Sequence, residues 1–118
     1  VYKRQVETYG YAMLNSGAEK EAMSFVNIYD EFGDSADFKF LMALIYMKNG
    51  LFDNAVKEFK KAVLYESCKV EGVNSYQAYY NIGVIYECLG YNDKALEYYE
   101  RCGDYENAQN RVAYIKNN

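Results

Sequence analysis

The 118-residue sequence contains no proline, no tryptophan and no histidine. Without proline, the residue that most strongly breaks helices is missing, so long helical segments are allowed. Without histidine there is no Ser–His or Cys–His catalytic pair and no imidazole metal ligand. The glycines stand singly, so no glycine-rich phosphate loop is visible either. We therefore expect no catalytic, metal or cofactor site within these residues.

Basic residues are fewer than acidic ones, 13 against 17, which gives a net charge of −4. The nearest approach to a basic cluster, Lys57, Lys60 and Lys61, is interrupted by Glu58, as on a solvated helix face. Binding to nucleic acid needs a basic stripe, so no nucleic acid partner is expected. No apolar run approaches the roughly 18 residues that span a bilayer, and no signal peptide is visible.

Cysteine is also scarce: Cys68, Cys88 and Cys102 are widely spaced and form no Cys-x-x-Cys pair. This pattern is typical of free thiols in a reducing compartment, which predicts a cytoplasmic location. Cys102 follows Tyr99 by three positions on the expected apolar side of a helix, so it is predicted to be a core thiol. The sequence begins with Val1 rather than methionine, which leaves open whether it is a fragment of a longer protein.

Three segments share one pattern of small residues, in which a glycine follows the first small residue by 7 positions and an alanine follows it by 12. The triplets are Gly10, Gly17 and Ala22; Ala43, Gly50 and Ala55; and Gly83, Gly90 and Ala95. Apolar residues precede each glycine at helical spacing. Glycine readily adopts the left-handed conformation that ends a helix. The pattern therefore predicts pairs of helices that cross closely at the small residues.

The clearest copy, residues 79–99, resembles the tetratricopeptide repeat, a helix–turn–helix unit of about 34 residues. The resemblance implies an all-α fold, a right-handed superhelical solenoid of three helix pairs plus a C-terminal capping helix. A stack of repeats needs a terminal element with a polar outer face, and the last segment supplies one. We expect one domain over residues 1–118, with repeats at about 3–35, 36–69 and 76–103 and the capping helix at 104–117.

Individual helices are expected at residues 2–15, 19–31, 35–49, 53–66, 75–89, 93–101 and 104–116. Side chains that accept hydrogen bonds from backbone N–H groups favour helix starts. The predicted N-caps are Asp34 or Ser35, Asp53, Ser75, Asn92 and Asp104. A long connection, residues 66–75, separates the second repeat from the third.

The first helix of each pair lines the concave wall of such a superhelix. By the repeat motif, the predicted partner-binding residues on this wall are Glu7, Tyr11, Leu14, Phe40, Leu44, Met47, Tyr80, Val84 and Glu87. Residues expected at its rim are Arg4, Asp37, Gln77 and Asn81. An exposed set of aromatic and aliphatic side chains would mark an interface with a protein or peptide. The alternative is that these side chains are packed between neighbouring helices, because the helices are apolar nearly all round.

Some members of the tetratricopeptide repeat family hold the C-terminal carboxylate of a chaperone with a clamp of lysines, an arginine and asparagines. At the matching positions this sequence carries Glu7, Tyr11, Leu41, Gln77 and Asn81. An acidic C-terminal peptide is therefore a poor ligand, whereas an amphipathic helix or a neutral segment is favoured.

A narrower resemblance concerns residues 71–90 and 98–105, with the long connection before them and the Gly103-Asp104 break. They are similar to the repeat region that follows the catalytic domain in family-two glycosyltransferases of gut Firmicutes. That resemblance implies a bacterial, non-catalytic region that positions a larger enzyme or its acceptor. Three hypotheses follow: a binding module for a protein, a peptide or an adjoining domain; the glycosyltransferase region; and a self-associating unit that forms a homodimer. The identity of the partner, the oligomeric state, the pathway and the occupancy of the groove stay open.

Overall fold

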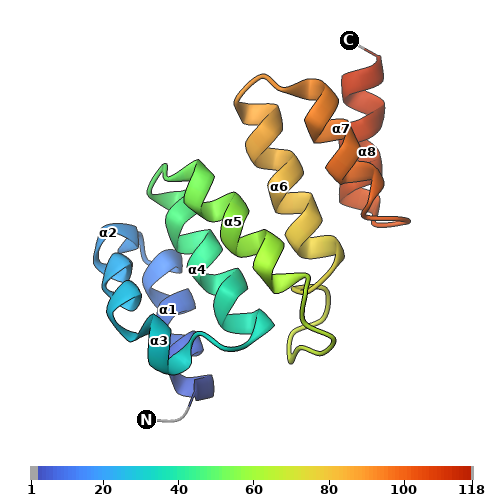
Figure 1. The fold of residues 1–118 in the computed structure, drawn as a ribbon. Coiled ribbons are helices and arrows are strands. Elements are labelled where there is room, and N and C mark those ends of the chain that lie inside the picture. The colour runs from blue at the N-terminus through green and yellow to red at the C-terminus, as the bar shows by residue number, and fades with distance from the viewer. Residues whose placement is uncertain (1–2, 118) are drawn as a thin grey trace.

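The computed structural model describes residues 3–117, and within this range every regular element is helical (Figure 1). The elements are α1 (Lys3–Asn15), α2 (Glu19–Ala22), the 3-10 helix η1 (Met23–Ile28), α3 (Tyr29–Phe32), α4 (Ala36–Lys48), α5 (Phe52–Ala62), α6 (Tyr76–Cys88), α7 (Asn92–Glu100) and α8 (Glu106–Lys116). The helices stack in chain order and the two ends of the chain lie at opposite ends of the stack. The prediction of an all-α solenoid is confirmed.

Small residues lie where paired helices cross. Ala22, Ala55 and Ala95 are fully buried. A Cβ atom on Gly83 would lie 2.6 Å from the ring of Tyr99. One on Gly10 would lie 2.9 Å from the ring of Phe25 in the same pair and 2.7 Å from Leu41 Cδ2 of α4. Neither position has room for a side chain, which confirms the crossing points that the small-residue pattern predicts.

The glycine that ends each first helix has a positive φ angle: 83° at Gly17, 76° at Gly50 and 86° at Gly90. The residue after each of these glycines donates its N–H to the carbonyl five positions earlier, at 2.8, 2.9 and 2.9 Å. This is the Schellman arrangement, which satisfies the last carbonyls of a helix and needs a left-handed residue. Any residue with a Cβ would be strained there, so the three turns keep their glycines for conformational reasons.

The predicted N-caps are right at one helix and wrong at three. The hydroxyl of Ser35 accepts from the N–H of Phe38 at 3.0 Å, so it caps α4. Ser75 stands at the N-cap of α6, but its side chain makes no capping hydrogen bond. The residues that precede α5, α7 and α8 are Leu51, Tyr91 and Tyr105, in place of Asp53, Asn92 and Asp104. At α5 and α7 the Schellman turn leads directly into the next helix, so the residue after the glycine takes the cap position.

The second helix of the first pair is not continuous. The expected helix over residues 19–31 is α-helical at α2 and α3 but 3-10 helical over Met23–Ile28. Serine, valine, asparagine and isoleucine within η1 all favour the α-helix less than alanine or leucine do. Helix α5 also ends earlier than expected, at Ala62 rather than residue 66. The expected helix start at residue 2 lies outside the described residues.

Candidate functional site

We call the nine predicted wall residues on α1, α4 and α6 the first-helix face. Two of them are buried: Glu7 is 9% exposed and Phe40 is 4% exposed. The ring of Phe40 packs edge-on against Phe59 of α5, with 5.3 Å between ring centroids. Phe40 therefore belongs to the core between α4 and α5, and its prediction as an exposed wall residue is wrong. Its apolar ring fills space between α4 and α5, so the residue type reflects packing within this helix pair.

The other wall residues on α1 and α4 are half-buried. Tyr11 and Leu14 pack against the cluster shared by the first pair and α4, whereas Leu44 and Met47 pack against the cluster shared by α4, α5, α6 and α7. Helices α1 and α4 contact each other directly. The four side chains thus combine a buried side that anchors them with a side that reaches solvent.

Carboxylates gather at the α1–α4 end of this face. Burial raises the pKa of the Tyr11 hydroxyl, and the nearby charges of Asp37 and Glu7 raise it further. Tyr11 therefore keeps its O–H as a hydrogen-bond donor even above the pH at which an ordinary tyrosine ionises. Both carboxylates are buried, and they give this end of the face negative charge where a carboxylate clamp would need basic groups.

The predicted rim residues are engaged within the protein. Asp37 is 5% exposed and accepts from the N–H groups of Lys69 and Val70, both at 2.9 Å. The side-chain amide of Gln77 donates to the carbonyl of Glu71, and that of Asn81 donates to the carbonyl of Gln77. Asp37 and Gln77 thus hold the middle of the connection between the second and third pairs, at Lys69, Val70 and Glu71. The side chain of Arg4 lies outside the described residues.

At the other end of the face, α8 engages Tyr80, Val84 and Glu87. These three residues line a hollow of about 340 Å3 together with Cys88, Tyr99 and Arg111. Glu87 accepts from Tyr99 Oη at 2.8 Å and from Arg111 Nε at 3.1 Å, and it forms an ion pair with Arg111. The hydrogen bond from Arg111 lowers the pKa of Glu87. Since Arg111 lies in α8, the capping helix contacts the part of the first-helix face that lies on α6.

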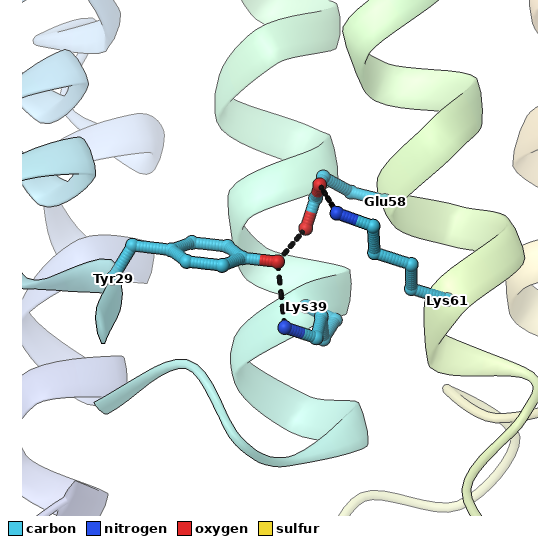
Figure 2. A network of polar contacts seen from close by, with 4 residues as sticks. All are labelled: Tyr29, Lys39, Glu58 and Lys61. Atoms are coloured by element: carbon cyan, nitrogen blue, oxygen red, sulfur yellow. Dashed lines mark hydrogen bonds and ion pairs between the residues drawn. The ribbon is translucent and has the colours of Figure 1, made fainter. Parts of the chain in front are cut away.

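A polar cluster that the sequence did not reveal joins the first pair to the second (Figure 2). The hydroxyl of Tyr29 donates to Glu58 Oε1 at 2.5 Å and accepts from Lys39 Nζ at 2.6 Å. Lys61 Nζ donates to the second carboxylate oxygen of Glu58 at 3.0 Å. Glu58 is 6% exposed, so its interpretation as part of a solvated face is wrong. Nothing in the local sequence shows that Tyr29, in α3, covers it.

The three cysteines are free thiols. Cys102 is buried, as predicted for a core thiol, and burial raises its pKa to about 11, so the sulfur is unreactive at neutral pH. Cys88 is exposed and Cys68 is half-buried. Among the helices of residues 3–117, none has the length and apolar character needed to cross a membrane.

Comparison with known proteins finds one family. A family model described as the tetratricopeptide repeat matches residues 36–67 and 76–109, and the two stretches together cover more than half of the chain. They contain α4 with α5, and α6 with α7 and the start of α8. The first pair lies outside both matches. No curated protein matches the chain.

Proposed function

Because this chain belongs to the tetratricopeptide repeat family, a non-catalytic scaffold repeat that generally mediates protein–protein interaction, we propose that it holds a protein partner along the first-helix face. We further propose that residues 1–118 act as one unit, with repeats at about 3–35, 36–69 and 76–103 and a capping helix at 104–117. The free thiols favour a reducing compartment, the cytoplasm.

One observation carries the proposal: four half-buried side chains of the first-helix face lie on adjacent helices, Tyr11 and Leu14 on α1 and Leu44 and Met47 on α4. Aromatic, leucine and methionine side chains with one anchored side can bury further apolar area against a partner at low entropic cost. Phe40 and Glu7 are removed from the predicted set because they are buried, while Tyr80, Val84 and Glu87 form a second part of the face next to α8.

The partner that fits these groups is an amphipathic helix or a neutral segment. An acidic C-terminal peptide is disfavoured, since Glu7 and Asp37 lie near Tyr11. Nucleic acid is disfavoured as well, because acidic residues outnumber basic ones, 17 against 13.

The test is capture of a partner from extract of the source cells by the wild type and by Leu44→Glu combined with Met47→Glu. A matched control is Leu64→Glu, since Leu64 is 80% exposed and follows α5 rather than lying on a first helix. We expect the double variant to lose the captured protein and the control to retain it, with the helical circular dichroism unchanged in both. Equal capture by all three proteins would contradict the proposed surface.

Two alternatives predict different results. In a non-catalytic region of a bacterial family-two glycosyltransferase, suggested by the connection before α6 and the early break at Gly103, the partner would be an adjoining domain. Coding sequence upstream of Val1 for an α/β domain with an Asp-x-Asp element would favour this alternative over a free-standing module. A self-associating unit would give a dimer mass in light scattering across a concentration series, and a constant monomer mass would exclude it.

A further inference from the structure

One asparagine side chain ties the end of α4 to the first pair. The Asn49 amide nitrogen donates to the carbonyl of Glu19, at the start of α2, at 2.7 Å and to the carbonyl of Ile45 at 2.8 Å. Carbonyl oxygens only accept hydrogen bonds, so these two contacts need the amide form of the side chain. The residue after Asn49 is Gly50, and this is the one Asn-Gly pair in the sequence.

From this arrangement we propose that Asn49 is a deamidation site whose reaction is gated by the first pair, a property separate from the partner binding proposed above. When the first pair opens, water converts the Asn49 side chain to a carboxylate, and the carboxylate then prevents the first pair from closing as before. An asparagine that precedes glycine is prone to this reaction, because glycine has no Cβ to hinder attack by its backbone nitrogen.

The reaction balances with water as its co-reactant. The Gly50 backbone nitrogen, after losing its proton to solvent, attacks Asn49 Cγ. A new N–C bond closes a cyclic imide, the C–N bond of the side-chain amide breaks, and ammonia leaves with a proton taken from solvent. Water then opens the imide at either of its carbonyls, which gives aspartate or isoaspartate at position 49.

The folded structure opposes ring closure in two ways. The ψ angle of Asn49 is 7°, so the Gly50 nitrogen nearly eclipses the Asn49 backbone nitrogen and lies away from the Cβ of the side chain that it must attack. The turn is fixed as well, because the N–H of Gly50 donates to the carbonyl of Met47 at 3.1 Å and the N–H of Leu51 donates to that of Tyr46 at 2.9 Å. Reaction therefore requires a local opening in which α2 releases Asn49 and the last turn of α4 rotates.

The first pair is the part of the stack that we expect to open. Its second helix is interrupted by η1 over Met23–Ile28, and 3-10 hydrogen bonds have poorer geometry than those of an α-helix. Asn49 bonds to α2 directly before this interruption. The segment that restrains the amide is thus also the least regular second helix of the three pairs.

The product cannot restore the original contacts. A carboxylate has no hydrogen to donate, so its oxygens would face the carbonyl oxygens of Glu19 and Ile45 with like charge. Isoaspartate also adds one carbon to the backbone of the turn at Gly50. If the first-helix face binds a partner as proposed, the modification would loosen the pair that carries Tyr11 and Leu14, a consequence that rests on the proposed function.

The first test is the rate of deamidation at Asn49 in the folded protein at mildly alkaline pH, measured by peptide mass spectrometry against a synthetic peptide of residues 45–53. We expect the protein to react several-fold more slowly than the peptide. An equal rate in the two would show that the fold does not restrain Asn49 and would overturn the proposal.

Three variants locate the opening. Tyr29→Phe loosens the first pair at Glu58 and should raise the rate several-fold, whereas Tyr65→Phe, which loses an exposed bond to Asp34, should not. Gly83→Ala crowds the third pair against Tyr99 and should leave the rate unchanged. Equal acceleration by Tyr29→Phe and Gly83→Ala would mean that the whole chain must unfold, and no acceleration in Tyr29→Phe would mean that the first pair is not the gate. Either result would contradict the proposal.

The second test concerns the product and needs no partner, so it can fail while the binding proposal stands. Asn49→Asp should speed amide exchange in α2 and η1 several-fold, with exchange in α6 and α7 unchanged. The matched control is Asn54→Asp, which makes the same change of charge at an exposed position of α5. Equal exchange in α2 and η1 of the two variants would show that the amide of Asn49 does not hold the first pair.

Discussion

The first and third helix pairs have small residues at the same spacing, but different side chains pack against these small residues. In the third pair, Gly83 faces the ring of Tyr99, which is 1% exposed and tied by its hydroxyl to Glu87. In the first pair, Gly10 faces a terminal methyl of Leu41 in the next pair and an edge of Phe25. The second helix is continuous in the third pair and broken at Met23–Ile28 in the first.

This difference separates two requirements of a repeat. Close crossing needs only small residues in the right register, and both pairs meet it. A regular second helix needs helix-forming residues as well, and the first pair lacks them over η1. The family model matches the second and third pairs only, and these are the pairs whose second helix is regular. The first pair packs on α4 through a shared apolar cluster and adds the polar contacts of Tyr29 with Lys39 and Glu58.

The largest expected effect comes from filling the two crossings. Gly83→Leu should destabilise the protein by about 3 kcal/mol, because the ring of Tyr99 packs against Tyr80 and its hydroxyl is bonded to Glu87. Gly10→Leu should cost less, since its nearest neighbour is the end of the flexible Leu41 side chain, which no hydrogen bond fixes. Urea unfolding measures both, with Ala113→Leu on the exposed side of α8 as a control that stays within about 0.5 kcal/mol. A larger loss for Gly10→Leu would contradict the difference between the crossings.

The polar junction of the first pair is the next test. Tyr29→Phe removes a hydrogen bond to the buried carboxylate of Glu58 and should cost about 2 kcal/mol. Tyr65→Phe also removes a hydrogen bond between a phenol and a carboxylate, here to exposed Asp34, so its cost should stay below about 0.5 kcal/mol. The same urea experiment compares them. Similar costs for the two variants would show that burial of Glu58 is not what makes the junction stabilising.

The two serines at helix starts give a smaller contrast. Ser35→Ala should cost about 1 kcal/mol, because the N–H of Phe38 loses its acceptor. Ser75→Ala should cost less than half as much, since the Ser75 side chain makes no capping hydrogen bond. Thermal unfolding of both variants would reveal the order. Equal shifts in Tm would mean that the hydrogen bond from Phe38 to Ser35 does not add to the stability of the protein.

The smallest effect is the pH dependence of the C-terminal end. The folded pKa of Glu87 is lowered, so its stabilising contribution is complete above the unfolded pKa of about 4.3 and is lost as pH falls through the folded value. The stability difference between wild type and Glu87→Gln, below about 1 kcal/mol, should therefore shrink from pH 6 to pH 3. The control Glu97→Gln loses only an exposed ion pair with Arg101 and should show a weaker trend. A difference that grows in acid would contradict this sign.

Sequence patterns predicted the parts of the fold that depend on local geometry. Gly50 and Gly90 end helices because of backbone conformation, and Gly83 marks a crossing because of size, so spacing alone located them. Sequence patterns gave wrong predictions for residues whose exposure depends on contacts with residues far away in the sequence. Asp37 looked like a rim residue, yet Lys69 and Val70, more than thirty positions away, cover it.

The candidate site was predicted less well for the same reason. An apolar residue on a first helix satisfies the repeat motif whether it faces the partner helix or solvent, so Phe40 could not be told from Leu44. The contact of Glu87 with Arg111 joins residues 24 positions apart on different helices, and no spacing rule relates them. Sequence thus placed the predicted face on α1, α4 and α6, but it did not distinguish the side chains of that face that are buried from those that reach solvent.

Hydrogen exchange of the captured complex tests the binding proposal most directly. We expect slower amide exchange, on adding the partner, in the peptides of α1 and α4 that carry Tyr11 and Leu44, with exchange in α5 and α7 unchanged. Slower exchange confined to α5 and α7, with α1 and α4 unaffected, would contradict the assignment of the first-helix face as the binding surface.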